Sequence, residues 1–209
     1  MRALAGLATA MLVAGAALAT PATQPATPAP EPHHLVSVKD SPGYVPLADP
    51  DSMAEKLGRR PDAKIVNLPF TGGARSMDAL ARAICGAFHA ESVDSMLALC
   101  VNSAEFREIL WPEFPQSRPA TGIRWDDAWQ ILWGRLNGGS VASVREYGGH
   151  VYTLVRVERT AATVEYKNFK LHNGVTLVLK DDEGQVKRLS WIRSVAERKG
   201  RFKIYSMSD

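Results

Sequence analysis

The stretch Gly148-Gly-His-Val-Tyr-Thr-Leu-Val-Arg-Val-Glu158 divides the sequence into two parts with different apolar spacing. Before it, apolar residues recur every three or four positions, which is the period of a helix that buries one face. After it, apolar and polar residues alternate, which is the period of a half-buried strand. Helices followed by strands predict an α+β domain, in which N-terminal helices pack on one face of a curved antiparallel β-sheet.

The helical part begins with a well-capped helix. Ser76 is a good N-cap, and Leu80, Ile84 and Phe88 fall on one stripe of the helix that follows it. A second helix starts near Ser92, and the short link between the two helices predicts antiparallel packing. Further helices are predicted over Ala104–Leu110 and Trp125–Leu136, with a break at Asn137–Ser140 and a short restart that ends at Gly148–Gly149.

The second part predicts five strands, over His150–Glu158, Ala162–Leu171, Val175–Lys180, Gln185–Val195 and Arg201–Met207. Four turn-like segments separate them: Arg159–Ala161, His172–Gly174, Asp181–Gly184 and Ala196–Gly200. Each separator is short enough for a β-hairpin, so we expect an antiparallel meander.

Three segments precede this domain, which spans residues 76–209. Residues 1–19 are apolar and end in Ala17-Leu-Ala19, which predicts a cleaved signal peptide. The alternative is a membrane anchor, but the run is short and rich in Ala and Gly, whereas a spanning helix needs about 20 apolar residues. Residues 20–32 form a linker rich in Pro, Ala and Thr, and residues 33–75 form an irregular N-terminal extension. We therefore expect an exported chain, periplasmic or extracellular, with no membrane contact after cleavage.

Charge and motif content exclude several classes of function. The chain has 25 basic and 22 acidic residues, and removal of Arg2 with the signal leaves 24 basic residues. This near-even balance argues against a nucleic-acid partner. His33 and His34 have no further ligand at metal-binding spacing, so no metal site is expected. Because the sequence also lacks phosphate-binding glycine loops and a Gly-x-Ser-x-Gly elbow, we expect no cofactor and identify no catalytic residue.

Cys85 and Cys100 are the only cysteines. Export would permit a disulfide between them, and the predicted helical hairpin could bring their sulfur atoms together. The alternative is two buried free thiols, because cysteine packs well as a small apolar residue. Sequence alone does not decide between these two states.

The order of elements resembles the NTF2-like superfamily, which includes ketosteroid isomerases, scytalone dehydratase and SnoaL-type cyclases. The most specific part of the resemblance is the end of the chain, where Ser190-Trp191 is followed by a turn and by Gly200-Arg-Phe-Lys-Ile-Tyr205. The resemblance covers roughly residues 76–209 and implies a cone with an apolar cavity between the helices and the sheet. It implies no activity, because that fold hosts enzymes, binding modules and interaction domains.

The candidate site residues are mostly large aromatic side chains that could line the cone. In the stretch Trp125-Asp-Asp-Ala-Trp-Gln-Ile-Leu-Trp-Gly-Arg-Leu136, a helical wheel places Trp129 in the core and Trp133 at the rim beside Asp126. The predicted ligand-binding residues are Trp111, Trp133, Tyr152, Tyr166, Trp191 and Asp126.

These residues predict a non-catalytic module that binds a small apolar or amphipathic ligand, or a protein partner, in the cone. The alternative is an isomerase, dehydratase or cyclase that uses the same cavity without a cofactor. A third interpretation is a homodimer through the outer face of the sheet. The C-terminal strands would then carry apolar residues on both faces, for example Val164, Tyr166, Val178 and Ile192.

Overall fold

Helices occupy the first half of the structure and strands the second, and the helices contact the strands. The computed structural model describes residue 60 and residues 62–208, which belong to the unit Leu47–Asp209. The α+β class is therefore confirmed. The predicted signal peptide, the linker and most of the extension lie outside the described residues. No helix within the described range has the length and apolar character needed to cross a membrane.

The first two helices begin at the predicted caps. Helix α2 spans Met77–His89, and the Ser76 hydroxyl accepts a hydrogen bond from the backbone N–H of Ala79 at 3.0 Å. Helix α3 spans Val93–Ala98 and is capped in the same way by Ser92. Serine at these positions satisfies an N–H group that has no partner inside the helix.

The next segment is helical but irregular. Helix α4, Ser103–Glu105, begins with a capping box at Asn102 and continues as the π-helical turn η2, Phe106–Leu110. This confirms a third helical segment over Ala104–Leu110. Three short 3₁₀ turns follow: η3 (Trp111–Glu113), η4 (Pro115–Ser117) and η5 (Pro119–Thr121). A proline stands at the start of each of these turns, where its missing N–H costs no hydrogen bond.

Helix α5, Trp125–Tyr147, is one continuous helix, so the predicted break at Asn137–Ser140 is wrong. Gly139 is buried, and a Cβ atom at that position would lie 2.7 Å from Cβ of Met207. Glycine here allows the helix to pack closely against the last strand. It does not end the helix, because the packing of α5 on its neighbours outweighs the low helix propensity of glycine.

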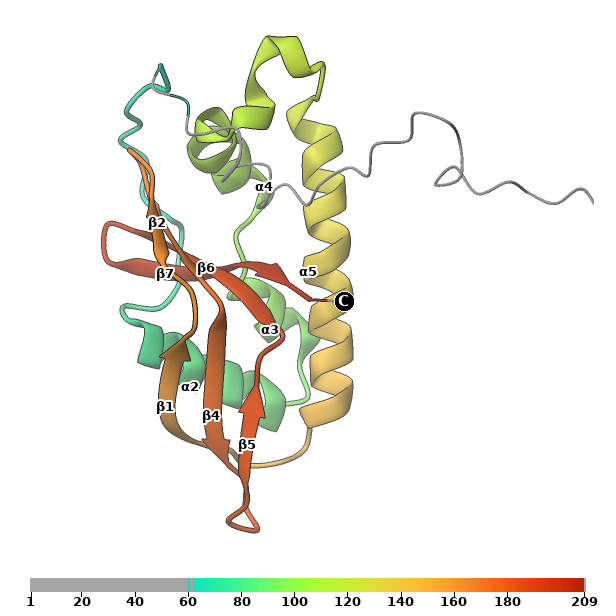
Figure 1. The fold of residues 1–209 in the computed structure, drawn as a ribbon. Helices are drawn as coiled ribbons and strands as arrows, with labels where there is room; N and C mark the ends of the chain where they lie inside the picture. The colour runs from blue at the N-terminus through green and yellow to red at the C-terminus, as the bar shows by residue number, and fades with distance from the viewer. Residues whose placement is uncertain (1–59, 61, 209) are drawn as a thin grey trace, which may run out of the picture. The chain divides into compact units, whose positions relative to one another are not determined.

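The strands form two antiparallel sheets instead of the single sheet that we expected. Strands β1 (Thr153–Arg159), β4 (Val175–Lys180) and β5 (Val186–Leu189) form one sheet in the order β1-β4-β5. Strands β2 (Thr163–Glu165), β3 (Lys170–Asn173), β6 (Ile192–Arg198) and β7 (Arg201–Met207) form the other, in the order β2-β3-β6-β7. Figure 1 shows β1, β4 and β5 running at a steep angle to β7, with α2 and α5 beside them.

Two predicted hairpin turns are wrong, because they lie where the chain passes from one sheet to the other. Arg159–Ala161 and His172–Gly174 do not reverse the chain. The N–H of Thr160 donates to the carbonyl of Gly174 at 3.0 Å, and the N–H of Gly174 donates to that of Arg193 at 2.8 Å. Gly174 has a φ of 63°, and a Cβ atom there would lie 2.3 Å from the Thr160 hydroxyl. Glycine is therefore required by this crossing.

Two of the predicted strands, Ala162–Leu171 and Gln185–Val195, are each divided in two. The first contains the turn between β2 and β3, where the N–H of Tyr166 donates to the carbonyl of Phe169 at 2.8 Å. The buried Glu113 carboxylate stabilises this turn by accepting the N–H groups of Lys167 and Asn168, both at 2.6 Å. The second divides between β5 and β6, beside Trp191.

The described end of the N-terminal extension is attached to the domain along the β6–β7 hairpin. Ala74 forms an antiparallel bridge with Phe202. The buried guanidinium of Arg198 donates to the carbonyl of Leu68 at 2.5 Å, and also to those of Val66 and Asn168. Residues 66–74 therefore pack on the domain, through hydrogen bonds that the irregular sequence did not predict.

Candidate functional site

Three of the predicted site residues belong to an aromatic cluster around Phe106 and Phe114. The ring of Trp111 lies 5.8 Å from that of Phe106. Trp133 stacks on Trp129 at 5.9 Å, and Trp129 in turn lies 5.6 Å from Phe106. Tyr166 stacks on Phe169 at 4.3 Å and meets Phe114 edge-on at 5.6 Å. These rings pack against one another, as aromatic side chains do in a core.

Two others, Tyr152 and Trp191, belong to a second cluster around Phe88. Their rings lie 5.9 Å and 6.2 Å from the Phe88 ring, both in edge-to-face orientation. Tyr147 completes this cluster at 5.5 Å from Phe88. The structure therefore separates the predicted aromatic residues into two clusters and does not bring them together around one cavity.

The last predicted residue, Asp126, is engaged at the start of α5. Its carboxylate accepts hydrogen bonds from Nε and Nη2 of Arg124 at 2.9 and 2.6 Å. This interaction lowers the pKa of Asp126 below its ordinary value. Among the six predicted residues, Tyr152 is the one that lines either of two pockets in the described part of the chain.

Cys85 and Cys100 are free thiols in this structure, and both are buried. The Cys100 thiol donates to the carbonyl of Met96 at 3.6 Å. Burial raises the pKa of Cys85 to about 11 and that of Cys100 to about 12. A thiol that stays protonated at neutral pH is a poor nucleophile, so neither residue has the character of a catalytic cysteine.

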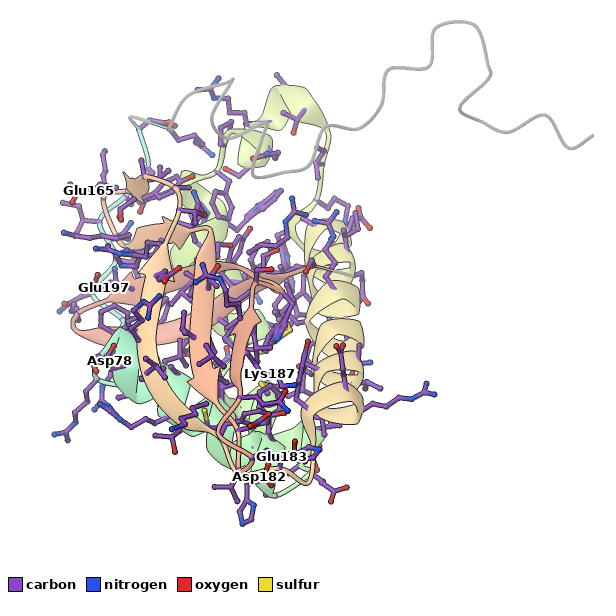
Figure 2. All side chains as sticks on the ribbon, turned by 60° about the horizontal axis from the view of Figure 1, so that its bottom comes forward. Asp78, Glu165, Asp182, Glu183, Lys187 and Glu197 are labelled. Carbon is purple, nitrogen blue, oxygen red and sulfur yellow. The ribbon has the colours of Figure 1, made fainter. Side chains whose placement is uncertain are left out.

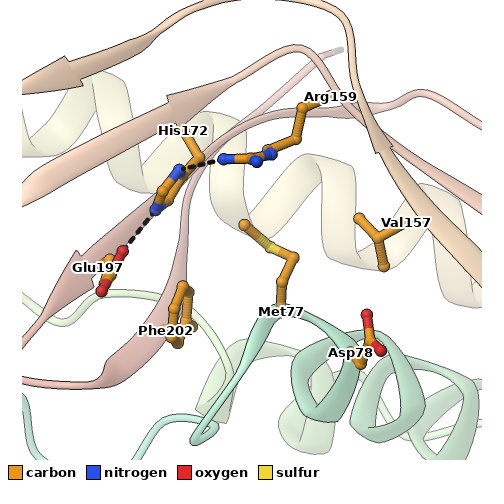
Figure 3. A pocket seen from close by; sticks show the side chains of 7 residues that line it. All are labelled: Met77, Asp78, Val157, Arg159, His172, Glu197 and Phe202. Carbon is orange, nitrogen blue, oxygen red and sulfur yellow. Dashed lines mark hydrogen bonds and ion pairs between the residues drawn. The ribbon is translucent and has the colours of Figure 1, made fainter.

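One pocket lies beside the first turn of α2, and we call it the α2 pocket. It has a volume of about 370 Å³, which falls within the range of small-molecule sites. Its lining residues are Met77, Asp78, Val157, Arg159, His172, Glu197 and Phe202. Figure 3 shows the Met77 side chain pointing between His172 and Val157.

Strand register brings the polar wall of the α2 pocket together. Thr163 is paired with His172, and His172 with Val195. Because side chains alternate along a strand, Glu197 points to the same face as Val195 and His172. Phe202 is paired with Glu197 in β7, so its ring joins this face and stacks on His172 at 5.9 Å.

The His172 ring is held by a chain of hydrogen bonds. Its Nε2 atom lies 2.8 Å from Oε2 of Glu197, and its Nδ1 atom lies 3.0 Å from the Thr163 hydroxyl. Nη1 of Arg159 is 3.4 Å from the same Nδ1 atom. A guanidinium group only donates hydrogen bonds, so Nδ1 carries the lone pair and Nε2 carries the proton. With these roles, the ring donates from Nε2 to Glu197 and accepts at Nδ1.

Two charged groups of the α2 pocket have no ion-pair partner among the residues that the structure describes. Among the described residues, the Arg159 guanidinium forms hydrogen bonds with the Thr163 hydroxyl and the His172 ring. The Asp78 carboxylate is exposed in the first turn of α2, and Figure 3 shows it on the side of the pocket opposite Arg159. Met77, Val157 and Phe202 supply an apolar surface between them. This arrangement can hold a small molecule that has both an apolar part and polar ends.

The sequence did not reveal this pocket, because His172 and Glu197 were both predicted in turns. They lie in strands instead, and their contact depends on the pairing of β3 with β6. A spacing of 25 residues between a histidine and a glutamate carries no signal without that register. The alternation of side chains along the strands could have indicated the contact between His172 and Glu197 only if the strand boundaries had been predicted correctly.

A second pocket, with a volume of about 480 Å³, lies at the hairpin between β4 and β5. Most of its lining residues are polar or charged: Glu146, Tyr147, His150, Tyr152, Asp181, Asp182, Glu183, Lys187, Arg188 and Leu189. Figure 2 shows Asp182 and Glu183 together at this hairpin, away from Asp78 and Glu197. Two of its charged residues, Lys187 and Asp181, form an ion pair at 3.6 Å. Within residues 62–208, no group of three metal-ligating side chains occurs here or elsewhere.

The structure is an α+β domain, and its α2 pocket has a lining of both polar and apolar residues. No protein-family model, curated protein or solved structure matches the chain. The resemblance to the NTF2-like superfamily therefore stays a prediction.

Proposed function

We propose that the chain is an exported NTF2-like module that binds a small amphipathic ligand without catalysing a reaction, and that the α2 pocket is its ligand site. In this proposal, the two sheets are the two halves of a curved sheet that bends at Gly174. The hydrogen bonds that Gly174 makes to Thr160 and Arg193 support this view, because they continue the strand pairing across the bend.

The observation that carries the proposal is the combination of groups in the α2 pocket. Phe202 and Val157 offer an apolar surface, while Arg159 and Asp78 offer opposite charges that no described residue neutralises. The His172 ring beside Arg159 is fixed by Glu197 and Thr163. A rigid wall with fixed polar groups favours binding, because little side-chain entropy is lost when the ligand enters.

Mass spectrometry of the full chain, purified from a host that exports it, tests this proposal. Native spectra should show a retained small molecule, and denaturing spectra should release it and give its mass. Asp78→Asn should reduce retention at least tenfold. Asp94→Asn is the matched control. Asp94 lies in the first turn of α3, where its negative charge interacts favourably with the helix dipole, as that of Asp78 does in α2. An empty protein that also shows no thermal shift with any of a panel of amphipathic metabolites would contradict the proposal.

The second candidate is a cofactor-independent enzyme of the isomerase, dehydratase or cyclase type. The hydrogen-bonded pair of His172 and Glu197 on a pocket wall favours it, because a carboxylate that orients an imidazole is the usual arrangement of a general base. A substrate would have to replace Thr163 as the partner of Nδ1. If the purified protein converts the retained molecule, and His172→Gln stops conversion while retention persists, the enzyme is favoured over the binding module.

A further inference from the structure

One face of α5 is exposed and apolar, although the opposite face is packed in the core. Ile131 and Val141 are 55% and 46% exposed. Between them lie Gly134 and Gly138, and a Cβ atom at either glycine would have no neighbour within 4 Å. Leu136 is fully buried on the other side of the helix. We call the exposed side of α5, residues 127–145, the outer α5 face.

The residues of this face are arranged symmetrically about the level of Leu136. Gly134 and Gly138 lie two residues to either side of it, and Ile131 and Val141 lie five residues to either side. Asp127 and Arg145 lie nine residues to either side. At about 100° per residue, all six side chains fall within about 40° of one line along the helix.

The two charged ends of the face form no ion pair within the described part of the protein, although the nearby Arg124 interacts electrostatically with Asp127. Neither the Asp127 carboxylate nor the Arg145 guanidinium forms an ion pair there. They are 18 residues apart, which is five helical turns or about 27 Å, so they cannot reach each other within one helix. The face therefore has a negative end, an apolar middle with two glycines, and a positive end.

We propose that the outer α5 face binds the same face of a second copy, with the two helices antiparallel about a two-fold axis at the level of Leu136. In this arrangement, Gly134 lies level with the partner's Gly138, and Ile131 lies level with the partner's Val141. Asp127 lies level with the partner's Arg145. A two-fold axis requires such a self-complementary surface.

Charge selects this arrangement over the parallel one. A parallel pair would place Asp127 beside the partner's Asp127 and Arg145 beside the partner's Arg145, which is repulsive at both ends. The two glycines allow the helix backbones to approach closely, because no Cβ atom separates them. The predicted dimer through the sheet has less exposed surface to use, since Val178 and Ile192 are each only 1% exposed within one subunit.

The interface is small, so the dimer should be weak. A single helix of 23 residues is about 35 Å long, and stable dimers usually bury at least 1,200 Å² in total. We expect dimers to form at a protein concentration of about 100 µM and to dissociate on dilution.

Sedimentation velocity of the full chain over a range of concentrations gives the first test. Wild type should change from monomer to dimer as the concentration rises. The double variant Gly134→Gln with Gly138→Gln should weaken association at least tenfold, because its new side chains keep the helices apart. Gly86→Gln is the matched control, since Gly86 is also an exposed helical glycine with no neighbour within 4 Å of its Cβ position. The Gly86→Gln variant should dimerise like wild type.

Zero-length cross-linking gives the second test and reports orientation. The variant Arg145→Lys keeps the positive charge and introduces an amine, which a carbodiimide can join to the partner's Asp127. The joined peptides should appear only in the dimer band and should disappear when Asp127→Asn is added.

Three outcomes would overturn the proposal. The first is a wild-type protein that stays monomeric at all concentrations. The second is a double glycine variant that dimerises like wild type. The third is cross-linking of the new amine at position 145 to an acidic residue among residues 1–59 of the same chain, which would mean that the chain covers its own outer α5 face.

Discussion

Nζ of Lys203 lies 2.8 Å from Oε2 of Glu105, and the two side chains are only 3% and 4% exposed. The same carboxylate accepts the N–H groups of Thr71 and Asn102 at 2.6 and 2.9 Å. The Lys203 ammonium also donates to the carbonyl of Thr71 at 3.1 Å. This ion pair therefore joins strand β7, helix α4 and the extension that precedes α2.

Removal of one partner of this pair should be costly, because it leaves an uncompensated charge in the core. We expect Lys203→Met to lower the free energy of unfolding by about 3–5 kcal/mol. Adding Glu105→Gln to it should recover part of this loss, since the uncompensated charge is removed while one acceptor oxygen remains for the N–H groups of Thr71 and Asn102. Urea denaturation measures both variants. Lys170→Met serves as the control, because its partner Glu165 is exposed and such a surface pair contributes less than about 1 kcal/mol. Equal losses of stability in Lys203→Met and Lys170→Met would contradict the prediction.

The predictable parts of the fold depend on local signals. The caps at Ser76 and Ser92 correctly located the starts of α2 and α3, because a cap depends on neighbouring residues alone. Strands β4 and β7 agree with the predicted ranges Val175–Lys180 and Arg201–Met207. Each of these ranges directly follows a glycine in a segment with turn propensity, at Gly174 and Gly200.

The unpredictable parts depend on contacts between distant residues. The turn between β2 and β3 is stabilised by Glu113, which lies more than 50 positions earlier. Gly174 was predicted in a hairpin turn, but its positive φ serves the crossing between the sheets. The α2 pocket escaped prediction for the same reason, because its His172–Glu197 contact depends on the register that these turns establish.

Gly138 and Gly139 are adjacent in α5 but should respond oppositely to the same substitution. Gly138→Ala should raise the free energy of unfolding by about 0.5–1 kcal/mol, because the methyl group meets nothing and alanine favours the helix. Gly139→Ala should lower it by about 1–3 kcal/mol, because its Cβ atom would lie 2.7 Å from Cβ of Met207. Urea denaturation at low protein concentration, where the proposed dimer is absent, measures both effects. A stabilising Gly139→Ala would show that α5 does not pack against β7 in this way.

The buried cysteines should make stability fall at alkaline pH. Burial raises the pKa of Cys100 from 9.0 to about 12, so the folded protein favours the neutral thiol. The contribution of the neutral Cys100 thiol to the free energy of unfolding is fully present below pH 9, where the thiol of the unfolded chain is also neutral. This contribution is lost as the pH rises from 9 towards 12. Cys100→Ala should therefore show a smaller loss of stability than wild type between pH 9 and pH 11, as measured by thermal unfolding. Identical pH profiles would mean that the Cys100 thiol is not protected from ionisation.

The Glu113 carboxylate should be needed for the turn between β2 and β3. Glu113→Gln keeps its size but replaces one acceptor oxygen by an amide donor, which then faces the N–H of Lys167 or Asn168. We expect a loss of about 2–3 kcal/mol, since a buried backbone N–H is left without a partner. Hydrogen exchange should be faster at residues 165–170 than in wild type. Glu108→Gln, an exposed substitution in the preceding turn η2, should leave both measurements unchanged.

Trp133 and Trp129 differ in burial, and their alanine variants should separate the two roles first predicted for these tryptophans. Trp133 is 38% exposed and its main ring contact is the stack on Trp129, so Trp133→Ala should cost about 1 kcal/mol. Trp129 packs against both Phe106 and Trp133, so Trp129→Ala should cost about 3 kcal/mol. Neither residue lines the α2 pocket, and therefore Trp133→Ala should leave ligand retention unchanged in native mass spectra, whereas Phe202→Leu should reduce it. Loss of the ligand in Trp133→Ala with stability maintained would move the binding site from the α2 pocket to the rim of α5.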